Sequence, residues 1–267
     1  MNIPSLQTFG STLPANQWSA LCDAAIYSAA TSGTRAWRDS TMPPHIVAAG
    51  VDLATLETPG GDRCVVENFT REVDLSTTSL NGWDGNGSIS ADMWVYLWLL
   101  AQDPDNQRIA RQWAFIASSS SAAPTVAAEW THKRLISAAR IESGWQVAPF
   151  RHSGKRYQFS GRRLVAKYTS ARSKAAQSLA AAVPPQAEIA EISLLSDVTS
   201  GSLTIEAYTT NRSSSMYSAW AGSGKNGEAS GPIWCPSQSI DTAVTMSGTA
   251  SGSLYVTGFR WPEDAEP

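Results

Sequence analysis

Three apolar runs between residues 81 and 140 constrain the fold of this chain more than any other feature. The runs and the turn-rich segments beside them are, in chain order, 81–88 (turn), 92–101, 102–106 (turn), 109–117 and 133–140. Short apolar runs punctuated by Gly, Pro, Asn and Asp are typical of strands joined by hairpins. The segment 93–101 is too short to cross a bilayer as a helix. Its Trp and Tyr content favours a strand that is covered on both faces or lies at a subunit contact.

The remaining sequence repeats this succession of short apolar runs and turns. Residues 203–209 alternate strictly between apolar and polar side chains, which is the period of a half-buried strand. The chain carries on the order of ten strand signals at roughly 8–12-residue spacing, the pattern of sandwiches and jelly rolls. We therefore predict an all-β fold: an antiparallel, jelly-roll-like β-sandwich over residues 46–267. It forms either one body or two sub-modules divided near 170–185.

A different pattern precedes the strands. Residues 1–16 are polar and interrupted by proline, which indicates an extended arm. Asn16 is placed to cap a short helix in which Trp18, Leu21 and Ile26 share one apolar stripe. We predict that 1–45 forms this arm and helix and serves in attachment or oligomerisation, because so short a helix must dock to be stable. It packs either on its own domain or on a neighbouring subunit.

The chain is weakly charged and rich in tryptophan. Charged residues make up 16% of it, against about 25% in an average soluble domain. Its net charge is −3, and it contains 11 Trp residues. Such a surface suits association with other proteins or with sugars better than capture of nucleic acid. The first residues show neither the basic nor the apolar segment of a secretory signal, so folding in a cytoplasm, without membrane insertion, is expected.

No motif in the sequence indicates a metal, a cofactor or a catalytic centre. The three histidines follow no HExxH or HxH spacing. Cys22, Cys64 and Cys235 lie far apart, which favours buried reduced thiols over zinc ligands or a disulfide framework. No GxSxG, GxxxxGK(S/T) or strand-linked GxGxxG motif occurs. We therefore predict a non-enzymatic protein without metal or cofactor.

The candidate binding residues are Trp83, Asp84 and Trp145. Asp84 opens a run of alternating oxygen-bearing residues, as in a calcium loop, but Ile89 replaces the glycine at the sixth position and Val95 the glutamate at the twelfth. A tight turn is the better interpretation of this run. Both tryptophans lie in or beside turns and are expected to be exposed. Each could stack on a sugar ring, fill a subunit interface, or serve an ordinary core or edge role.

Several segments after residue 80 resemble, in the same order, segments of one known group of proteins. LNGWDG at 80–85 and MWVYLWLL at 93–100 resemble the "GxNGLD…WYYIYxI" segment of bacteriophage tail-fibre and related virion structural proteins. Later segments resemble that group's "LFSTSATAPTxPxGYxxKRRIGSIR" pattern and its "VDLSAxVPPTA" step, at 115–124, 133–140, 147–150, 157–159 and 179–187. The likeness covers about 80–267, with Trp83 where the pattern has Leu and no Pro-Gly-Tyr at 125–130.

This resemblance implies a β-sandwich in a tail fibre, baseplate or capsid-surface appendage of a bacteriophage, commonly a trimer and without enzymatic residues. On that basis we expect a non-enzymatic virion structural protein that is assembled in the host cytoplasm. Its expected partners are other virion proteins and further copies of itself in a homotrimer. Binding to a host receptor, such as a surface glycan, is a further expectation.

A second class of function stays open beside the first. A carbohydrate-binding or carbohydrate-cleaving β-sandwich would use the two exposed tryptophans and the acidic turn residues. Paired carboxylates for glycoside cleavage would come from Asp84, Asp92, Asp103 and Asp105. Carboxylates in such turns, however, usually serve turn geometry.

Overall fold

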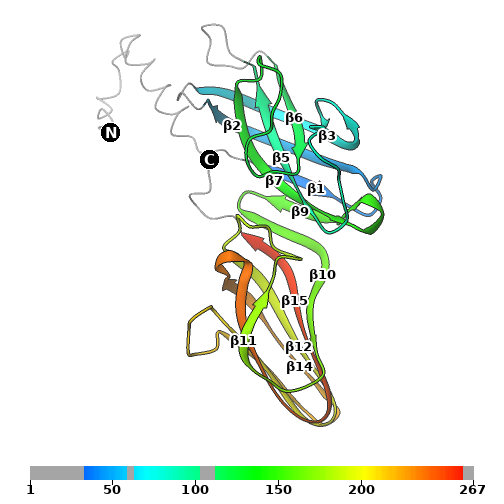
Figure 1. The fold of residues 1–267 in the computed structure, drawn as a ribbon, viewed down its shortest axis with the longest axis vertical. Coiled ribbons are helices and arrows are strands. Elements are labelled where there is room, and N and C mark those ends of the chain that lie inside the picture. The colour runs from blue at the N-terminus through cyan, green and yellow to red at the C-terminus, as the bar shows by residue number, and fades with distance from the viewer. Residues whose placement is uncertain (1–32, 59–62, 103–111, 261–267) are drawn as a thin grey trace, which may run out of the picture.

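The computed structural model describes residues 33–58, 63–102 and 112–260 (Figure 1). The prediction of an all-β chain is confirmed, with 67% strand and 3% helix. Two short 3-10 turns, η1 (Ser143–Trp145) and η2 (Pro236–Gln238), accompany the strands. The strands are β1 (Arg35–Arg38), β2 (Ile46–Glu57), β3 (Arg63–Thr78), β4 (Gly82–Trp83), β5 (Trp94–Ala101), β6 (Trp113–Ser118), β7 (His132–Glu142), β8 (Gln146–Val147), β9 (Phe150–Ser153), β10 (Arg156–Tyr168), β11 (Arg172–Ser178), β12 (Ile189–Tyr208), β13 (Tyr217–Gly222), β14 (Lys225–Trp234) and β15 (Ser239–Arg260).

Six of the strands close into a barrel, which forms the upper part of the molecule in Figure 1. The ladders run in the order β2-β3-β4-β6-β5-β7, and the ring closes where Glu57 of β2 pairs with Lys133 of β7. Closure removes the unpaired edges that an open sheet would present to other chains. On the outside, β1 pairs with β2 on one side and with β9 on the other, and so extends the sheet beyond the barrel.

Strand β5 lies between β6 and β7 in the barrel. All eight of its residues are buried, as expected for the segment 93–101 if both of its faces are covered. Successive side chains alternate between the two faces of a strand. Val95, Leu97 and Leu99 share one face, while Trp94, at the start of the other face, lies edge-on to Phe259 of β15 at 5.5 Å between ring centroids. Residues from the second part of the chain therefore help to cover β5.

The second group of strands, β10 to β15, is a long sheet folded back on itself. Gly201 of β12 and Gly248 of β15 are paired in register, and both have positive φ, 86° and 72°. Beyond this bend, a Cβ on Gly252 would lie 2.3 Å from the Ile205 side chain. The partner of Ile205 on β15 is Val244, and in a straight strand its eight-residue separation from Gly252 would span about 26 Å. The two halves of the sheet therefore face each other, as the lower part of Figure 1 shows.

The structure differs from the sequence-based expectation at two points. A single jelly-roll-like sandwich over 46–267 is not confirmed, because the first strands close into a barrel through the β2–β7 pair. Residues 35–38, inside the predicted arm 1–45, form β1 and are paired on both sides. The helix predicted from Asn16 lies outside the described residues. The division near 170–185 stays a prediction.

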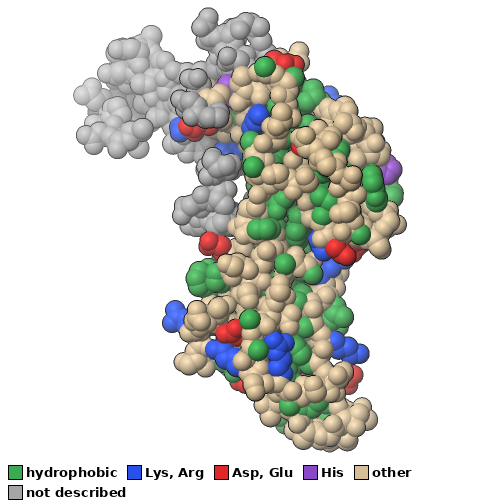
Figure 2. All heavy atoms as spheres, viewed as in Figure 1, with side chains coloured by type: hydrophobic (Ala, Val, Ile, Leu, Met, Phe, Trp, Pro, Cys, Tyr) green, Lys and Arg blue, Asp and Glu red, His purple; other side chains and the backbone are tan. Residues whose placement is uncertain are grey.

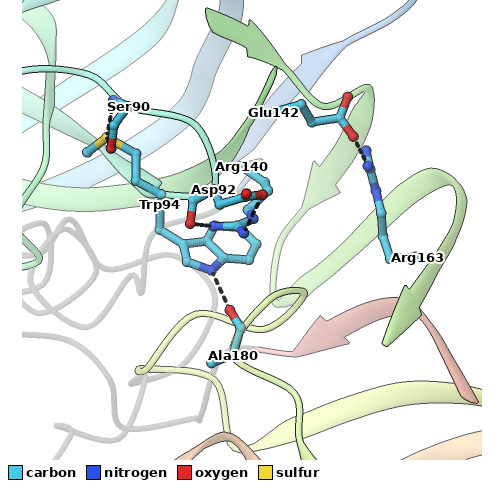
Figure 3. A network of polar contacts seen from close by, with 8 residues as sticks. Ser90, Asp92, Trp94, Arg140, Glu142, Arg163 and Ala180 are labelled. Carbon is cyan, nitrogen blue, oxygen red and sulfur yellow. Dashed lines mark hydrogen bonds and ion pairs between the residues drawn. The ribbon is translucent and has the colours of Figure 1, made fainter. Parts of the chain in front are cut away.

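A buried arginine lies at the junction between the barrel and the folded sheet. Arg140 of β7 is 6% exposed and donates to the Asp92 carbonyl oxygen and, at 3.1 Å, to its carboxylate Oδ1. The guanidinium also lies 5.8 Å from the centre of the Trp94 ring. The Trp94 Nε1–H donates to the Ala180 carbonyl oxygen at 3.4 Å (Figure 3). These contacts satisfy a charge that burial would otherwise make costly.

A second ion pair crosses the same junction. Glu142, at the end of β7, pairs with Arg163 of β10 (Figure 3). Burial lowers the pKa of Arg163 from its usual range, and the nearby charge of Arg140 lowers it further. The two arginines therefore repel each other, and each is held by its own carboxylate.

The surface carries few charges. On the face shown in Figure 2, Lys, Arg, Asp and Glu side chains lie in small scattered groups within an uncharged surface, in keeping with their 16% share of the sequence. No helix in the described part of the chain has the length and apolar content that a membrane span requires.

His152 makes the stability of the fold depend on pH. It is buried, its Nδ1 lies 2.9 Å from the Ser137 hydroxyl, and burial lowers its pKa to about 4. The unfolded chain, with a histidine pKa of about 6.5, binds the proton more readily, so stability is full above pH ~6.5 and falls as the pH drops towards 4. We expect His152 to lower the free energy of unfolding by roughly 2 to 3 kcal/mol between pH 7.5 and 4.5.

Urea unfolding at these two pH values checks this expectation. His152→Gln should reduce the difference between them by that amount. An undiminished difference in His152→Gln would contradict the assignment.

Candidate binding groove

A groove opens in the barrel wall between β3 and β6. No ladder joins these two strands directly in the described part of the sheet. The two-residue strand β4 bridges them, since Trp83 pairs with Thr78 of β3 and with Ala117 of β6. Away from this bridge lies a groove of about 790 Å³. It is lined by residues 69–72 of β3, by Gln112 just before β6, and by Trp113, the first residue of β6. Four consecutive strand residues line it, which means that the groove meets β3 along its edge and not on one face.

Aromatic side chains form much of the groove. Trp37 and Trp113 are partly exposed in it, and Phe69 lies between the groove and the core. The Phe69 ring stacks on Phe115 at 5.0 Å and meets Trp113 edge-on at 6.0 Å. Phe115 is fully buried. The partly exposed indole of Trp113 is therefore held in place through Phe69 by the barrel core, which gives the groove a preformed apolar wall.

Asn81 is locked at one end of the groove by its backbone. Its N–H donates to the Phe115 carbonyl oxygen at 2.7 Å, and its own carbonyl oxygen accepts from the Asp74 N–H at 2.8 Å. The side-chain Oδ1 accepts from the Phe115 N–H at 3.0 Å. Asn81 has a φ of 58°, a left-handed conformation that asparagine tolerates better than most residues. With these partners in place, the Nδ2 amide makes no hydrogen bond to any described residue.

Arg71 and Glu72 add one charge of each sign to the groove. Arg71 shares a face of β3 with the buried Phe69 and Val73 but is itself exposed, because the barrel wall is open beside it. Adjacent strand residues point to opposite faces, so Arg71 and Glu72 do not pair with each other. Neither side chain forms a hydrogen bond or an ion pair with another residue in the described ranges.

The structure separates the three binding residues predicted from the sequence. Trp83 is only 5% exposed and its Nε1–H donates to the Gly87 carbonyl oxygen at 3.4 Å, so the expectation that it is exposed is wrong. As the bridge between β3 and β6, it belongs to the barrel core. Asp84 accepts from the Asn86 N–H at 2.9 Å, as expected for a tight turn. Trp145 is 53% exposed, as predicted, and no described contact joins it to Trp83 or Asp84.

Other candidate side chains have structural roles or lie outside the described ranges. Asp92 is the partner of Arg140, and Asp103 and Asp105 are outside the described residues. Cys64 and Cys235 are buried thiols, as predicted, and burial raises the pKa of Cys235 to about 12. Within the described ranges, no group of three or more His, Cys, Asp or Glu is placed to hold a metal ion.

Comparisons with known proteins do not place the chain in a family. No protein-family model and no curated protein matches it. Among solved structures, a Bacillus endospore appendage protein, described as forming disulfide-linked pili, is 16% identical and covers 38% of this chain and 90% of its own, with a TM-score of 0.25. Insecticidal crystal protein Cry2Aa is 9% identical and covers 92% of this chain and 54% of its own, with a TM-score of 0.22. Likenesses this distant carry no argument about function.

The different burial of two tryptophans gives a direct test of this description. Trp83→Ala should lower the free energy of unfolding by about 3 to 5 kcal/mol, because it leaves a cavity in the barrel wall. Trp145→Ala should change it by less than about 0.5 kcal/mol. Thermal and urea unfolding of both variants measure the effects. Equal effects would contradict the placement of Trp83 in the core.

Proposed function

We propose that this chain is a non-enzymatic attachment protein that binds carbohydrate through the groove between β3 and β6. The observation that carries the proposal is the presence of Trp37 and Trp113, both partly exposed, beside polar side chains that have no partner among the described residues. The apolar face of a sugar ring packs well on an indole, and a few polar groups at the rim of an aromatic site fix the ligand's orientation. Arg71, Glu72 and the Asn81 amide supply such groups.

Binding is a better proposal than cleavage. Glycoside hydrolysis needs two carboxyl groups about 5 to 9.5 Å apart on either side of the scissile bond. Among the described residues that line the groove, Glu72 is the one carboxylate. The acidic turn residue Asp84 instead holds the backbone of its own turn.

The resemblance to tail-fibre and related proteins suggests where such binding would serve. In this proposal the chain is part of a bacteriophage virion, in a tail fibre, a baseplate or a capsid-surface appendage. Its partners are other virion proteins and two further copies of itself, and the groove meets a glycan on the host surface. The folded sheet of β10 to β15 supports the sandwich part of the predicted fold, because its two halves pack face to face.

Loss of the Trp37 indole should abolish most of the carbohydrate binding. We expect Trp37→Ala to weaken the affinity for a saccharide found on a glycan array by about tenfold or more, because a stacking surface is removed. Isothermal titration calorimetry of the full chain measures this change. Trp234→Ala is the matched control, since Trp234 is 51% exposed but does not line the groove. Equal affinity of Trp37→Ala and the unaltered chain would refute the assignment of the groove.

The virion setting has its own test. An antibody raised against this chain should label purified phage particles from cells that produce it, and electron microscopy shows where the label lies. Particles without label, at a normal yield of the protein in the cell, would rule out the virion assignment while leaving the carbohydrate site untouched.

A further inference from the structure

Three groove residues form a row across neighbouring strands. Trp37 of β1 is paired in register with Ala48 of β2, and Ala48 is paired with Glu72 of β3. Residues opposite each other in a sheet project from the same face, and neighbouring strands lie about 4.8 Å apart. The backbones of Trp37 and Glu72 are thus about 10 Å apart, with only the methyl group of Ala48 between them. In this row, the Trp37 indole and the Glu72 carboxylate lie on either side of the small Ala48 side chain.

Because the Ala48 side chain is small, there is room above it for a sugar ring beside the Trp37 indole. All three residues line the groove. A ring that packs on Trp37 above Ala48 would direct its substituents towards Glu72. The carboxylate is an acceptor with two oxygens and would bind neighbouring hydroxyl groups as donors.

The charges of the groove balance. Arg71 and Glu72 contribute one positive and one negative charge, and neither is neutralised by a described protein partner. Of the other cations near Trp37, Arg35 is already paired with Asp52 and donates to the Thr70 hydroxyl. Arg38 is only 6% exposed, and Arg151, opposite Trp37 on β9, interacts with the Asp39 carboxylate. The Arg71 guanidinium would therefore attract an anionic ligand and the Glu72 carboxylate would repel it, so the two charges together give no net attraction. A neutral polyhydroxyl ligand can use both, because hydroxyl groups donate to the carboxylate and accept from the guanidinium.

We propose that the groove selects a neutral saccharide, with one sugar ring packed on Trp37 above Ala48 and its hydroxyl groups held by Glu72, while Arg71, on the other face of β3, holds a hydroxyl group of the same saccharide where it passes the edge of the strand. The inference rests on the proposed carbohydrate-binding function and narrows it to a class of ligand. The Asn81 amide lies at the far end of the groove as a further neutral donor. In this assignment Glu72 and Arg71 determine specificity, and Trp37 contributes affinity for any sugar.

The test compares ligand classes on the full chain. The probes are neutral gluco-, galacto- and manno-oligosaccharides, uronic-acid oligosaccharides of the same length, sialylated oligosaccharides, and a proline-rich peptide as a non-sugar ligand for an aromatic groove. We expect at least one neutral oligosaccharide to bind in isothermal titration calorimetry and to bind more tightly than its uronic-acid counterpart. Its affinity should stay constant between 50 and 500 mM NaCl, because no ion pair forms.

Variants at the exposed rim identify the residues responsible. Glu72→Ala should weaken binding of the neutral saccharide by about tenfold or more, and Glu72→Gln by less, because the amide oxygen still accepts a hydrogen bond. Arg71→Ala should also weaken it. Glu67→Gln, on the same strand, exposed and outside the groove, is the matched control. Thermal unfolding verifies that each variant is folded.

The outcomes separate this inference from the function on which it rests. If only acidic saccharides bind, with an affinity that falls as salt rises, the neutral-ligand inference is overturned while carbohydrate binding stands. If a neutral saccharide binds equally well to Glu72→Ala, the inference is likewise overturned. If no saccharide binds, or only the peptide binds and Trp37→Ala abolishes that binding, both the inference and the proposed function fail.

Discussion

The barrel depends on a four-residue bridge, 81–84, that hydrogen-bonds to two strands at once. The Asn81 carbonyl oxygen accepts from the Asp74 N–H, while the N–H groups of Asn81 and Asp84 donate to Phe115 and Ala117. Because β3 and β6 share no ladder of their own in the described sheet, these bonds connect the two strands. So short a bridge closes only one end of the gap, and the remainder is the groove. The 81–84 bridge therefore closes the barrel wall at one end and leaves the groove open beside it.

The interior of the barrel preorganises the groove. Phe69 links the partly exposed Trp113 to the buried Phe115, so the aromatic wall is fixed before any ligand arrives. Asn81 holds a left-handed backbone conformation that costs of order 1 kcal/mol for a residue other than glycine. Two backbone hydrogen bonds and the bond from the Phe115 N–H to the Asn81 side chain compensate for that cost. A site built in this way loses little conformational freedom on binding, which favours affinity.

Local signals predicted the strands well, and the site poorly. The strand at 94–101 and the turn after Asp84 follow from side-chain pattern and turn residues within a few positions. The groove joins Trp37, Glu72 and Trp113, which lie on three strands far apart in the sequence, and no local pattern could bring them together. Barrel closure likewise rests on one pair between distant strands. The same holds for Trp83: its turn-like neighbours indicate exposure, while its bridging position between distant strands buries it.

Strand β1 has a consequence for the order in which the molecule is made. Arg35 pairs with Gly50 on one side and with Ser153 on the other. On the ribosome the first partner follows within seconds, while the second is translated only after more than a hundred further residues, at about 5 to 20 residues per second. During that interval one side of β1 has backbone groups without their final partner, a state that invites pairing with other nascent chains. Strand β1 therefore reaches its final pairing only after β9 has been synthesised.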